Sequence, residues 1–175
     1  MRTLTTLDLK NYEPGWHRYR RFAVRAVIFR KRDLLMVHST TDGFYKFPGG
    51  GIERGESHLD TLIRETKEEI GLSIIPKSVC ALGRIREVRR SIYKEHEIFD
   101  HTSYYYYAKV DDIIEKTQLS RYEAEFGFEL ACVSPETAYQ ANMKIASEDR
   151  TAFLFREAYI LKWLIKKQQK QELCK

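Results

Sequence analysis

The sequence "GGGIERGESHLDTLIRETKEEIGL", Gly49 to Leu72, predicts a glycine-rich loop followed by one helix. The run of three glycines, with Gly55 shortly after it, favours the loop. Ser57 is a favourable N-cap for the helix, and Asp60 completes an approximate capping box. Gly71 is a typical helix terminator because glycine readily adopts the left-handed conformation. We therefore expect a helix between Ser57 and Gly71.

Three glutamates lie close together near the end of this helix, at Glu65, Glu68 and Glu69. Their spacings of i, i+3 and i+4 place them on one face, where Glu65 and Glu69 repel by roughly a few tenths of a kcal/mol. The helix dipole also disfavours negative charge at this end. A divalent cation would offset both penalties, and carboxylate oxygens suit Mg²⁺ or Mn²⁺. A solvated charged face, with Arg64 paired to Glu68, is the alternative.

The spacing across the whole segment carries more information than the helix alone. The stretch from Gly50 to Leu72 resembles the Nudix box of the Nudix hydrolase family, G-x5-E-x7-R-E-U-x-E-E-x-G-U, where U is a bulky aliphatic residue. Every fixed polar and glycine position matches. Thr66 departs from the pattern because Ile, Leu or Val is usual there, but it lies on the core-facing stripe of the helix. The resemblance extends loosely over about Arg20 to Asn142.

The resemblance implies a Nudix-type α/β/α sandwich around a mixed β-sheet, with Mg²⁺ or Mn²⁺ as the cofactor. It implies metal binding by Glu65, Glu68, Glu69 and the backbone carbonyl of Gly50. Glu56 and Arg64 would brace the site, with Arg64 orienting Glu65, so that Glu65, Arg64 and Glu56 form the expected catalytic group. A bound cation neutralises phosphate charge and activates a water for attack.

The general base differs between members of such a family, so the sequence leaves it open. It is either a glutamate of the box, such as Glu65, or an acidic residue after the box. The candidates after the box are Glu97, Asp100, Glu123 and Glu125. Each of these four is also compatible with an ordinary surface role.

Substrate contacts are expected from a strand and from the glycine loop. Arg25 is the basic residue on the off-face of an apolar strand, so it faces either a substrate phosphate in the cleft or a salt-bridge partner at a solvent-exposed edge. Gly49 and Gly51 allow close approach of backbone to phosphate or metal. Tyr104, in the run "TSYYYYAKV", offers a ring for stacking on a base, although tyrosine also simply favours strands.

The rest of the chain predicts a mixed α/β domain. Strands are expected at Arg20–Phe29, Leu34–Ser39, Thr102–Val110 and Phe128–Ser134, and within "SVCALGRIREV"; helices are expected at Ser134–Asn142 and from about Ser147 to Gln171. We assign residues 1–145 to the Nudix domain. Residues 146–175 form a C-terminal helix that packs either on the domain or at a homodimer interface.

Composition adds limits on location and chemistry. The chain has 175 residues, 43% of them hydrophobic, and a net charge of +5. Its three cysteines, Cys80, Cys132 and Cys174, match no metal or redox spacing, which favours free thiols in a reducing cytosol. Cys80 and Cys132 lie in apolar runs and are expected in the core. No signal peptide or membrane span is visible, so we expect a cytoplasmic protein without membrane contact.

The leading functional prediction is metal-dependent hydrolysis of a pyrophosphate bond in a nucleoside diphosphate-linked substrate. A nucleoside triphosphate or a small nucleotide conjugate is favoured, because motifs that mark other substrate groups are not found. The alternative is a non-catalytic Nudix-fold domain that senses nucleotides or binds proteins, but such domains usually lose glutamates of the box. No nucleic acid partner is expected, since no RNA- or DNA-binding motif accompanies the arginine clusters.

Overall fold

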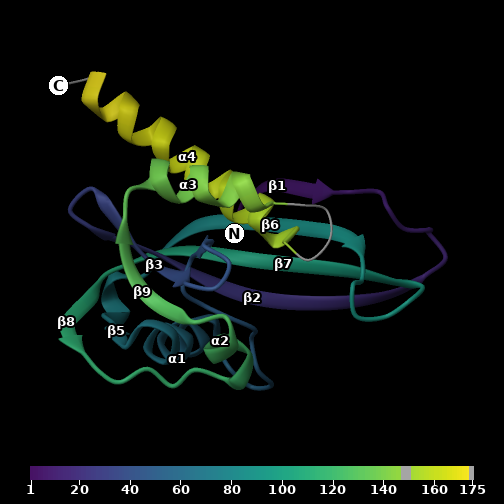
Figure 1. Ribbon diagram of the computed structural model, residues 1–175, viewed down its shortest axis with the longest axis horizontal. Coiled ribbons are helices and arrows are strands. Elements are labelled where there is room, and N and C mark those ends of the chain that lie inside the picture. The colour runs from purple at the N-terminus through teal and green to yellow at the C-terminus, as the bar shows by residue number, and fades with distance from the viewer. Residues whose placement is uncertain (147–150, 174–175) are drawn as a thin grey trace.

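The computed structural model describes residues 1–146 and 151–173 and shows a central sheet with helices on both faces (Figure 1). The elements, in chain order, are β1 (Thr3–Asp8), β2 (His17–Arg30), β3 (Asp33–Ser39), β4 (Tyr45–Lys46), α1 (His58–Ile70), β5 (Leu72–Ile74), the short 3₁₀ helix η1 (Pro76–Ser78), β6 (Cys80–Arg90), β7 (Glu97–Ala108), β8 (Val110–Ile114), α2 (Arg121–Glu125), β9 (Phe128–Val133), α3 (Pro135–Ile145) and α4 (Phe153–Leu173).

The main sheet has seven strands and is mixed. Its order is β1-β6-β7-β2-β3-β4, and β9 pairs with β3 outside this path. The pairs β1–β6 and β2–β7 are parallel, whereas β6–β7, β2–β3, β3–β4 and β3–β9 are antiparallel. This architecture confirms the α/β/α sandwich around a mixed sheet that the sequence predicts.

Each face of the sheet has its own hydrophobic core, which follows from the alternation of side chains along β2. On one face, Val24, Ala26 and Ile28 pack with Leu62 and Ile70 of α1. On the other face, Val27 and its neighbours pack with Ile160, Leu161 and Leu164 of α4. Figure 1 accordingly shows α1 below the sheet, and α3 and α4 above it.

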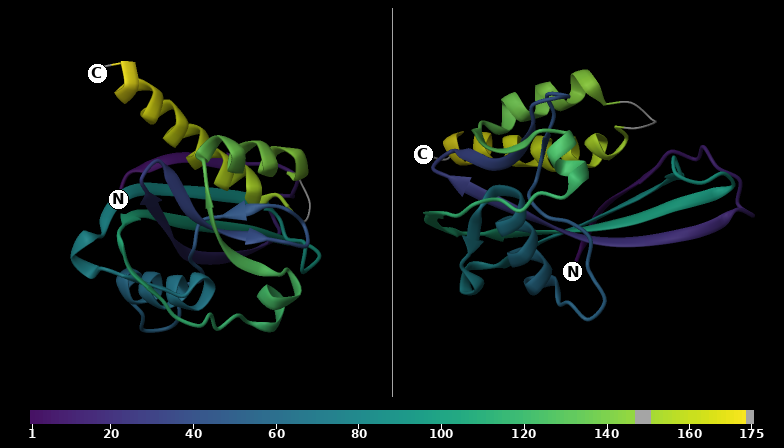
Figure 2. Two further views of the ribbon diagram at one scale, coloured as in Figure 1. Left: turned by 60° about the vertical axis from the view of Figure 1, so that its left-hand side comes forward. Right: turned by 60° about the horizontal axis from the view of Figure 1, so that its bottom comes forward.

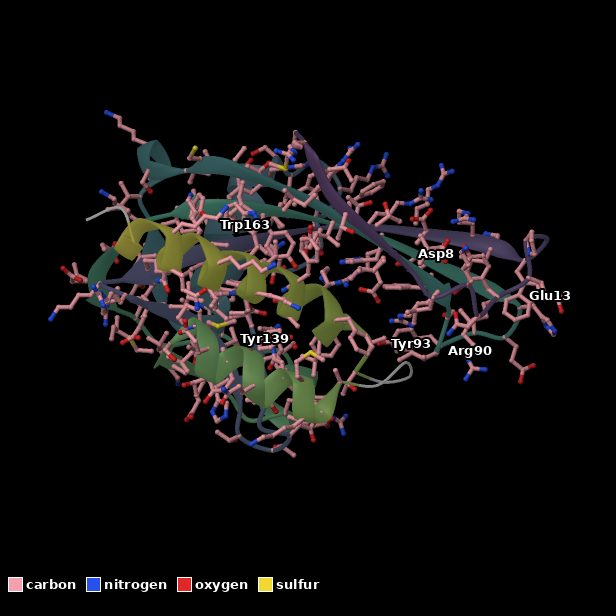
Figure 3. The ribbon with its side chains drawn as sticks, turned by 90° about the horizontal axis from the view of Figure 1, so that it is seen from above. Asp8, Glu13, Arg90, Tyr93, Tyr139 and Trp163 are labelled. Atoms are coloured by element: carbon pink, nitrogen blue, oxygen red, sulfur yellow. The ribbon has the colours of Figure 1, made fainter. Side chains whose placement is uncertain are left out.

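The strands β2, β6 and β7 are the longest of the sheet, with 14, 11 and 12 residues, and β1 runs beside β6. In the right-hand view of Figure 2 they extend past the helices as a projecting ribbon. Asp8, Glu13, Arg90 and Tyr93 lie near its far end, well away from Trp163 on α4 (Figure 3). The half of β2 that precedes Ala23 belongs to this ribbon, which explains why Tyr19 and Phe22 remain exposed.

The helix α1 begins and ends where the sequence predicts. The hydroxyl of Ser57 accepts a hydrogen bond from the Asp60 backbone, and the Asp60 side chain accepts one from the Ser57 backbone. Gly71 adopts the left-handed conformation, with φ 69°. Ser134 likewise caps α3 by accepting a hydrogen bond from the Thr137 backbone.

The structure corrects the expected placement of two cysteines. Cys80 and Cys132 are exposed rather than in the core, and Cys174 lies outside the described residues. Cys80 opens β6, before the part of that strand that is buried, and Cys132 lies on β9, whose only described strand partner is β3. The sequence also does not predict β1, which pairs with β6 at the edge of the sheet.

The C-terminal helix α4 packs on the domain that precedes it. Leu154, Ala158 and Leu161 are buried, and Tyr159 donates a hydrogen bond to the backbone carbonyl of Leu4. The helix begins at Phe153, whereas the sequence predicts a start near residue 147, which lies outside the described residues. Among the described helices, none is both long and apolar enough to span a membrane.

Candidate active site

A cavity of about 730 Å³ opens beside β2, where the glycine loop separates α1 from the projecting ribbon. Glu65 and Glu69 of α1 and Glu123 of α2 line its acidic side. Arg21 and Tyr19 of β2 and Phe99 of β7 also line the cavity. The cavity therefore joins a carboxylate cluster to an arginine and aromatic surface.

The carboxylate cluster consists of Glu65, Glu69 and Glu123. One oxygen from each lies within 4.8 Å of the others, which is close enough for one cation to contact all three. Glu69 is 1% exposed, accepts a hydrogen bond from the Gly49 amide at 2.8 Å, and pairs with the Lys46 ammonium at 2.5 Å. Burial raises the pKa of Glu69, and Lys46 opposes this by favouring the charged form.

The glycine loop approaches Glu65 so closely that a side chain at Gly50 would displace the Glu65 carboxylate. A Cβ atom at Gly50 would lie 2.2 Å from Oε2 of Glu65. The Gly50 carbonyl accepts a hydrogen bond from the Val24 amide at 3.0 Å and retains a second lone pair. Together with the three carboxylates, this carbonyl makes a set of hard oxygen donors that fits Mg²⁺ or Mn²⁺.

Arg64 connects the acidic residues of the box. Its guanidinium donates to Glu56 at 2.6 and 2.9 Å, to Glu65 at 2.8 Å and to Glu68 at 3.1 Å. Arg64 lowers the pKa of Glu56 to about 2, with a further contribution from the Thr61 hydroxyl. Glu68 is not in the carboxylate cluster of Glu65, Glu69 and Glu123, and its side chain is 36% exposed.

Arg25 lines the cavity but is committed to the backbone of the loop. It is 7% exposed, and its guanidinium donates to the carbonyls of Gly49 and Phe47. The sequence correctly places Arg25 on the face opposite Val24, but its described partners are loop carbonyls rather than a carboxylate at a solvent-exposed edge. Arg25 therefore holds the glycine loop against β2.

The structure separates the other candidate acids. Glu97 lines the cavity and lies 3.3 Å from the His17 ring, whereas Glu123 lies in the carboxylate cluster. Asp100 is bound by Arg18 and Arg86 and does not line the cavity. Glu125 pairs with Arg121 on the surface of α2.

Tyr104 does not line this cavity, which corrects its expected position at the cleft. Its ring packs against His58, with ring centroids 4.4 Å apart, on the side of the sheet that α1 covers. Because Tyr104 pairs with Val24, it shares the face of that core residue. Tyr19 and Phe99 are among the aromatic residues that face the cavity instead.

Two further residues at or near the site, Lys46 and Glu157, are not predicted from the sequence. Lys46 lies next to the glycine loop and is the ion-pair partner of Glu69. Glu157 of α4 is fully buried and accepts a hydrogen bond from the Phe47 amide at 2.9 Å and one from Tyr105 at 3.3 Å. The only sequence signal for Glu157 is a charge within the apolar stretch of a helix, next to Arg156.

Arg156 completes this buried ionic network. Its guanidinium donates to Glu87 at 2.8 Å and to Glu157 at 3.2 Å, and Arg89 donates to the same Glu87 carboxylate at 2.8 Å. Each buried charge therefore has a partner of opposite sign, which is the condition for its burial. The network ties α4 and β6 to the residue that opens the glycine loop.

Comparisons with known proteins concern the sequence and the fold of this chain. The model of the NUDIX domain family matches residues 19–153. An RNA pyrophosphohydrolase of Thioalkalivibrio sulfidiphilus is 41% identical over 74 residues, which are 42% of this chain and 42% of the relative. An RNA pyrophosphohydrolase of Campylobacter jejuni subsp. doylei is 37% identical over 68 residues, covering 35% of this chain and 38% of the relative. The chain thus spans less than half the length of these relatives.

A solved structure is similar to most of this chain in its fold. The NUDIX hydrolase from Nitrosomonas europaea matches with a TM-score of 0.55 and 20% sequence identity, over 81% of this chain and 88% of that one. At this identity the likeness concerns the fold alone. Since the family model covers more than half of its length and includes the box from Gly50 to Leu72, this chain belongs to the Nudix hydrolase family.

Proposed function

We propose that the protein hydrolyses a pyrophosphate bond in a nucleoside diphosphate-linked substrate, with Mg²⁺ or Mn²⁺ bound at the box. The favoured substrates are nucleoside triphosphates and small nucleotide conjugates. One observation carries the proposal: the oxygens of Glu65, Glu69 and Glu123 converge within 4.8 Å in a cavity large enough for a nucleotide. A purely solvated acidic face would not bury Glu69 or bring a third carboxylate from α2.

Some residues of the site would bind the cation, and others would keep those ligands in position. Glu65, Glu69 and the Gly50 carbonyl would hold the cation, Glu123 lies beside them in the carboxylate cluster, and Glu68 is a proposed further ligand on the solvent side. When bound, the cation would neutralise phosphate charge and lower the pKa of a coordinated water. Gly49 and Gly51 leave space for phosphate oxygens beside the loop.

The bracing residues keep the carboxylates in place. Arg64 fixes Glu65 through a hydrogen bond of 2.8 Å and is itself fixed by Glu56 at 2.6 Å. Such outer contacts orient ligands and commonly affect affinity or activity by about 10- to 100-fold when removed. Arg64 and Glu56 are therefore proposed as positioning residues.

Glu123 is the proposed general base. Among the acids after the box, it is the one in the carboxylate cluster, so its oxygen is near the position of a water activated at Glu65 and Glu69. A base must lie within hydrogen-bond reach of the proton that it removes. Glu97 lies 3.3 Å from His17 and Glu125 pairs with Arg121, and neither residue belongs to the carboxylate cluster.

The experiment is a substrate panel with Mg²⁺, scored for phosphate and pyrophosphate release. The panel contains nucleoside triphosphates, nucleotide sugars, dinucleoside polyphosphates and a 5′-triphosphate oligoribonucleotide, the last because relatives are named RNA pyrophosphohydrolases. We expect turnover of at least one small nucleotide and its loss when EDTA removes the metal. Hydrolysis of the oligoribonucleotide alone would contradict the proposed substrate class.

Variants link this activity to the cluster. Glu69→Gln should reduce kcat by about a hundredfold or more, because a carboxylate that would hold the cation is lost and the cation neutralises the phosphate charge. Glu125→Gln removes an equivalent charge from the surface of α2 and should leave kcat unchanged. Glu68→Gln tests the outer ligand. If Glu69→Gln and Glu68→Gln both turn over normally, the metal assignment is wrong.

A further inference from the structure

The basic side of the cavity contains one arginine that the catalytic proposal does not use. Arg21 lies on β2, four residues before Arg25, so both side chains are on the face that borders the cavity. A Cβ atom at Gly51 would lie 3.3 Å from Nη2 of Arg21. The guanidinium of Arg21 is therefore directly over the glycine loop.

The other arginines around the cavity already have partners. Arg25 donates to loop carbonyls, Arg89 pairs with Glu87, and Arg156 pairs with Glu87 and Glu157. Arg21 makes no hydrogen bond, ion pair or ring contact through its side chain with any described residue. Arg21 is an exposed residue whose guanidinium has five N–H donors available at the edge of the site.

The surroundings of Arg21 favour an anion. Its pKa is lowered, first because part of the side chain is removed from water and then because Arg25 and Arg156 lie nearby, whereas Tyr19 and Glu65 oppose this shift. The pKa of His101, the register partner of Arg21 on β7, is also lowered by burial and by the same group of arginines. A bound phosphate would relieve this concentration of positive charge.

Arg21 is also close to the carboxylate cluster. Glu65 approaches Gly50 and Arg21 approaches Gly51, so the two side chains meet adjacent residues of one loop. Adjacent Cα atoms are about 3.8 Å apart. A phosphate chain held at the carboxylates through a cation could therefore extend directly to the guanidinium.

An aromatic surface continues from Arg21 along the ribbon. Tyr19 lies two residues earlier on the same face, is 48% exposed, and pairs in register with Phe99. The centroids of these two rings are 6.2 Å apart, and the guanidinium of Arg89 covers the Phe99 ring at 4.6 Å. An exposed ring next to an unpaired guanidinium suits a planar base joined to a phosphate.

We propose that Arg21 and Tyr19 form a nucleoside-phosphate subsite, in which Arg21 binds a phosphate of the substrate and Tyr19 stacks on its base. The subsite rests on the proposed function in that it holds the nucleotide half of the same substrate. It assigns phosphate recognition to Arg21, while Arg25 positions the loop. It also places the base over the ribbon rather than over Tyr104.

The test measures binding of AMP and of ribose 5-phosphate by calorimetry in the presence of Mg²⁺. Neither probe contains a pyrophosphate bond, so hydrolysis does not interfere, and the two differ by the base. Arg21→Ala should weaken binding of both probes by about tenfold or more, as for loss of a charge-assisted hydrogen bond. Tyr19→Leu should weaken AMP by about fivefold or more and leave ribose 5-phosphate unchanged.

Arg20→Ala is the matched control. Arg20 is the neighbouring arginine, is exposed, and lies on the opposite face of β2, so its removal changes the net charge equally. The subsite is overturned if Arg21→Ala and Arg20→Ala bind the probes within twofold of each other, or if the parent protein binds neither probe. An unchanged affinity of Tyr19→Leu for AMP overturns the assignment of the base.

Kinetics separate this subsite from the proposed activity. With any hydrolysed nucleotide, Arg21→Ala should raise KM more than it lowers kcat. If the parent hydrolyses no substrate but binds AMP through Arg21, the catalytic proposal fails and the subsite stands. If the parent is active and Arg21→Ala has the KM and AMP affinity of Arg20→Ala, the subsite fails and the activity stands.

Discussion

Glu157→Gln tests whether the buried network of α4 supports the active-site loop. Glu157 accepts hydrogen bonds from the Phe47 amide at 2.9 Å, from Tyr105 at 3.3 Å and from Arg156 at 3.2 and 3.3 Å. Glutamine keeps the volume and one acceptor oxygen. It replaces the second oxygen with an NH₂ group, which would face the donors of Arg156 or Tyr105.

The expected cost follows from these contacts. Removing one partner of a buried ion pair typically costs about 3–5 kcal/mol. Arg156 keeps Glu87 at 2.8 Å, and the Phe47 amide keeps an acceptor, so we expect a value at the lower end, about 3 kcal/mol. For a domain of this size, 1 kcal/mol lowers Tm by about 2–4 °C, so Tm should fall by about 6–12 °C.

The assay combines urea denaturation with thermal melting, both followed by circular dichroism. Glu125→Gln is the control, because it removes the same charge from an exposed pair with Arg121. Such a pair contributes about 0.5 kcal/mol or less. At a temperature where both variants are folded, Glu157→Gln should also lower kcat, since Phe47 opens the glycine loop.

A Tm within 2 °C of the parent, with an unchanged urea m-value, would refute this reasoning. It would mean that Glu87 alone balances the buried positive charge of Arg156 once Glu157 is neutral. A lower Tm with fully retained kcat would show that the network stabilises the fold without supporting the loop.

Two further perturbations test the loop and its brace. Gly50→Ala should lower kcat/KM by about a hundredfold, because a Cβ atom there would lie 2.2 Å from the Glu65 carboxylate. Gly15→Ala is the control: a Cβ atom there has nothing within 4 Å, so neither kcat/KM nor Tm should change. Equal kinetics for both variants would contradict the close approach. Because Arg64 lowers the pKa of Glu56 from 4.5 to about 2, this pair should stabilise the fold above pH 4.5 and lose that contribution as the pH falls toward 2. In EDTA, the unfolding free energy of Glu56→Gln should therefore depend less on pH in this range than that of the parent. Parallel pH profiles of the two proteins would argue against the pair.

Local signals predict the box helix well because its ends are determined by neighbours in sequence. Ser57 and Asp60 satisfy the free amides at one end, and Gly71 adopts the conformation that ends the helix at the other. The spacing of the glutamates then places Glu65 and Glu69 on one face. None of these features depends on the rest of the fold.

The cavity depends on contacts between distant segments, which sequence patterns do not specify. Alternation places Arg25 on the correct face of β2 but does not identify loop carbonyls as its partners. Glu123 reaches the cluster only because α2 folds back beside α1. Tyr104 faces away from the cavity because β7 pairs with β2 in the register that aligns it with Val24.

The bond between Phe47 and Glu157 joins residues that are 110 positions apart, and this separation has a consequence for synthesis. At about 5–20 residues per second, the ribosome needs roughly 5–20 s to reach Glu157 after Phe47 has been made. From the time that Leu72 has been made until Glu157 is added, the nascent chain contains the complete box but not the carboxylate that accepts the hydrogen bond from Phe47. The active site is therefore completed late, after translation of α4, and a partly made chain should bind nucleotides poorly.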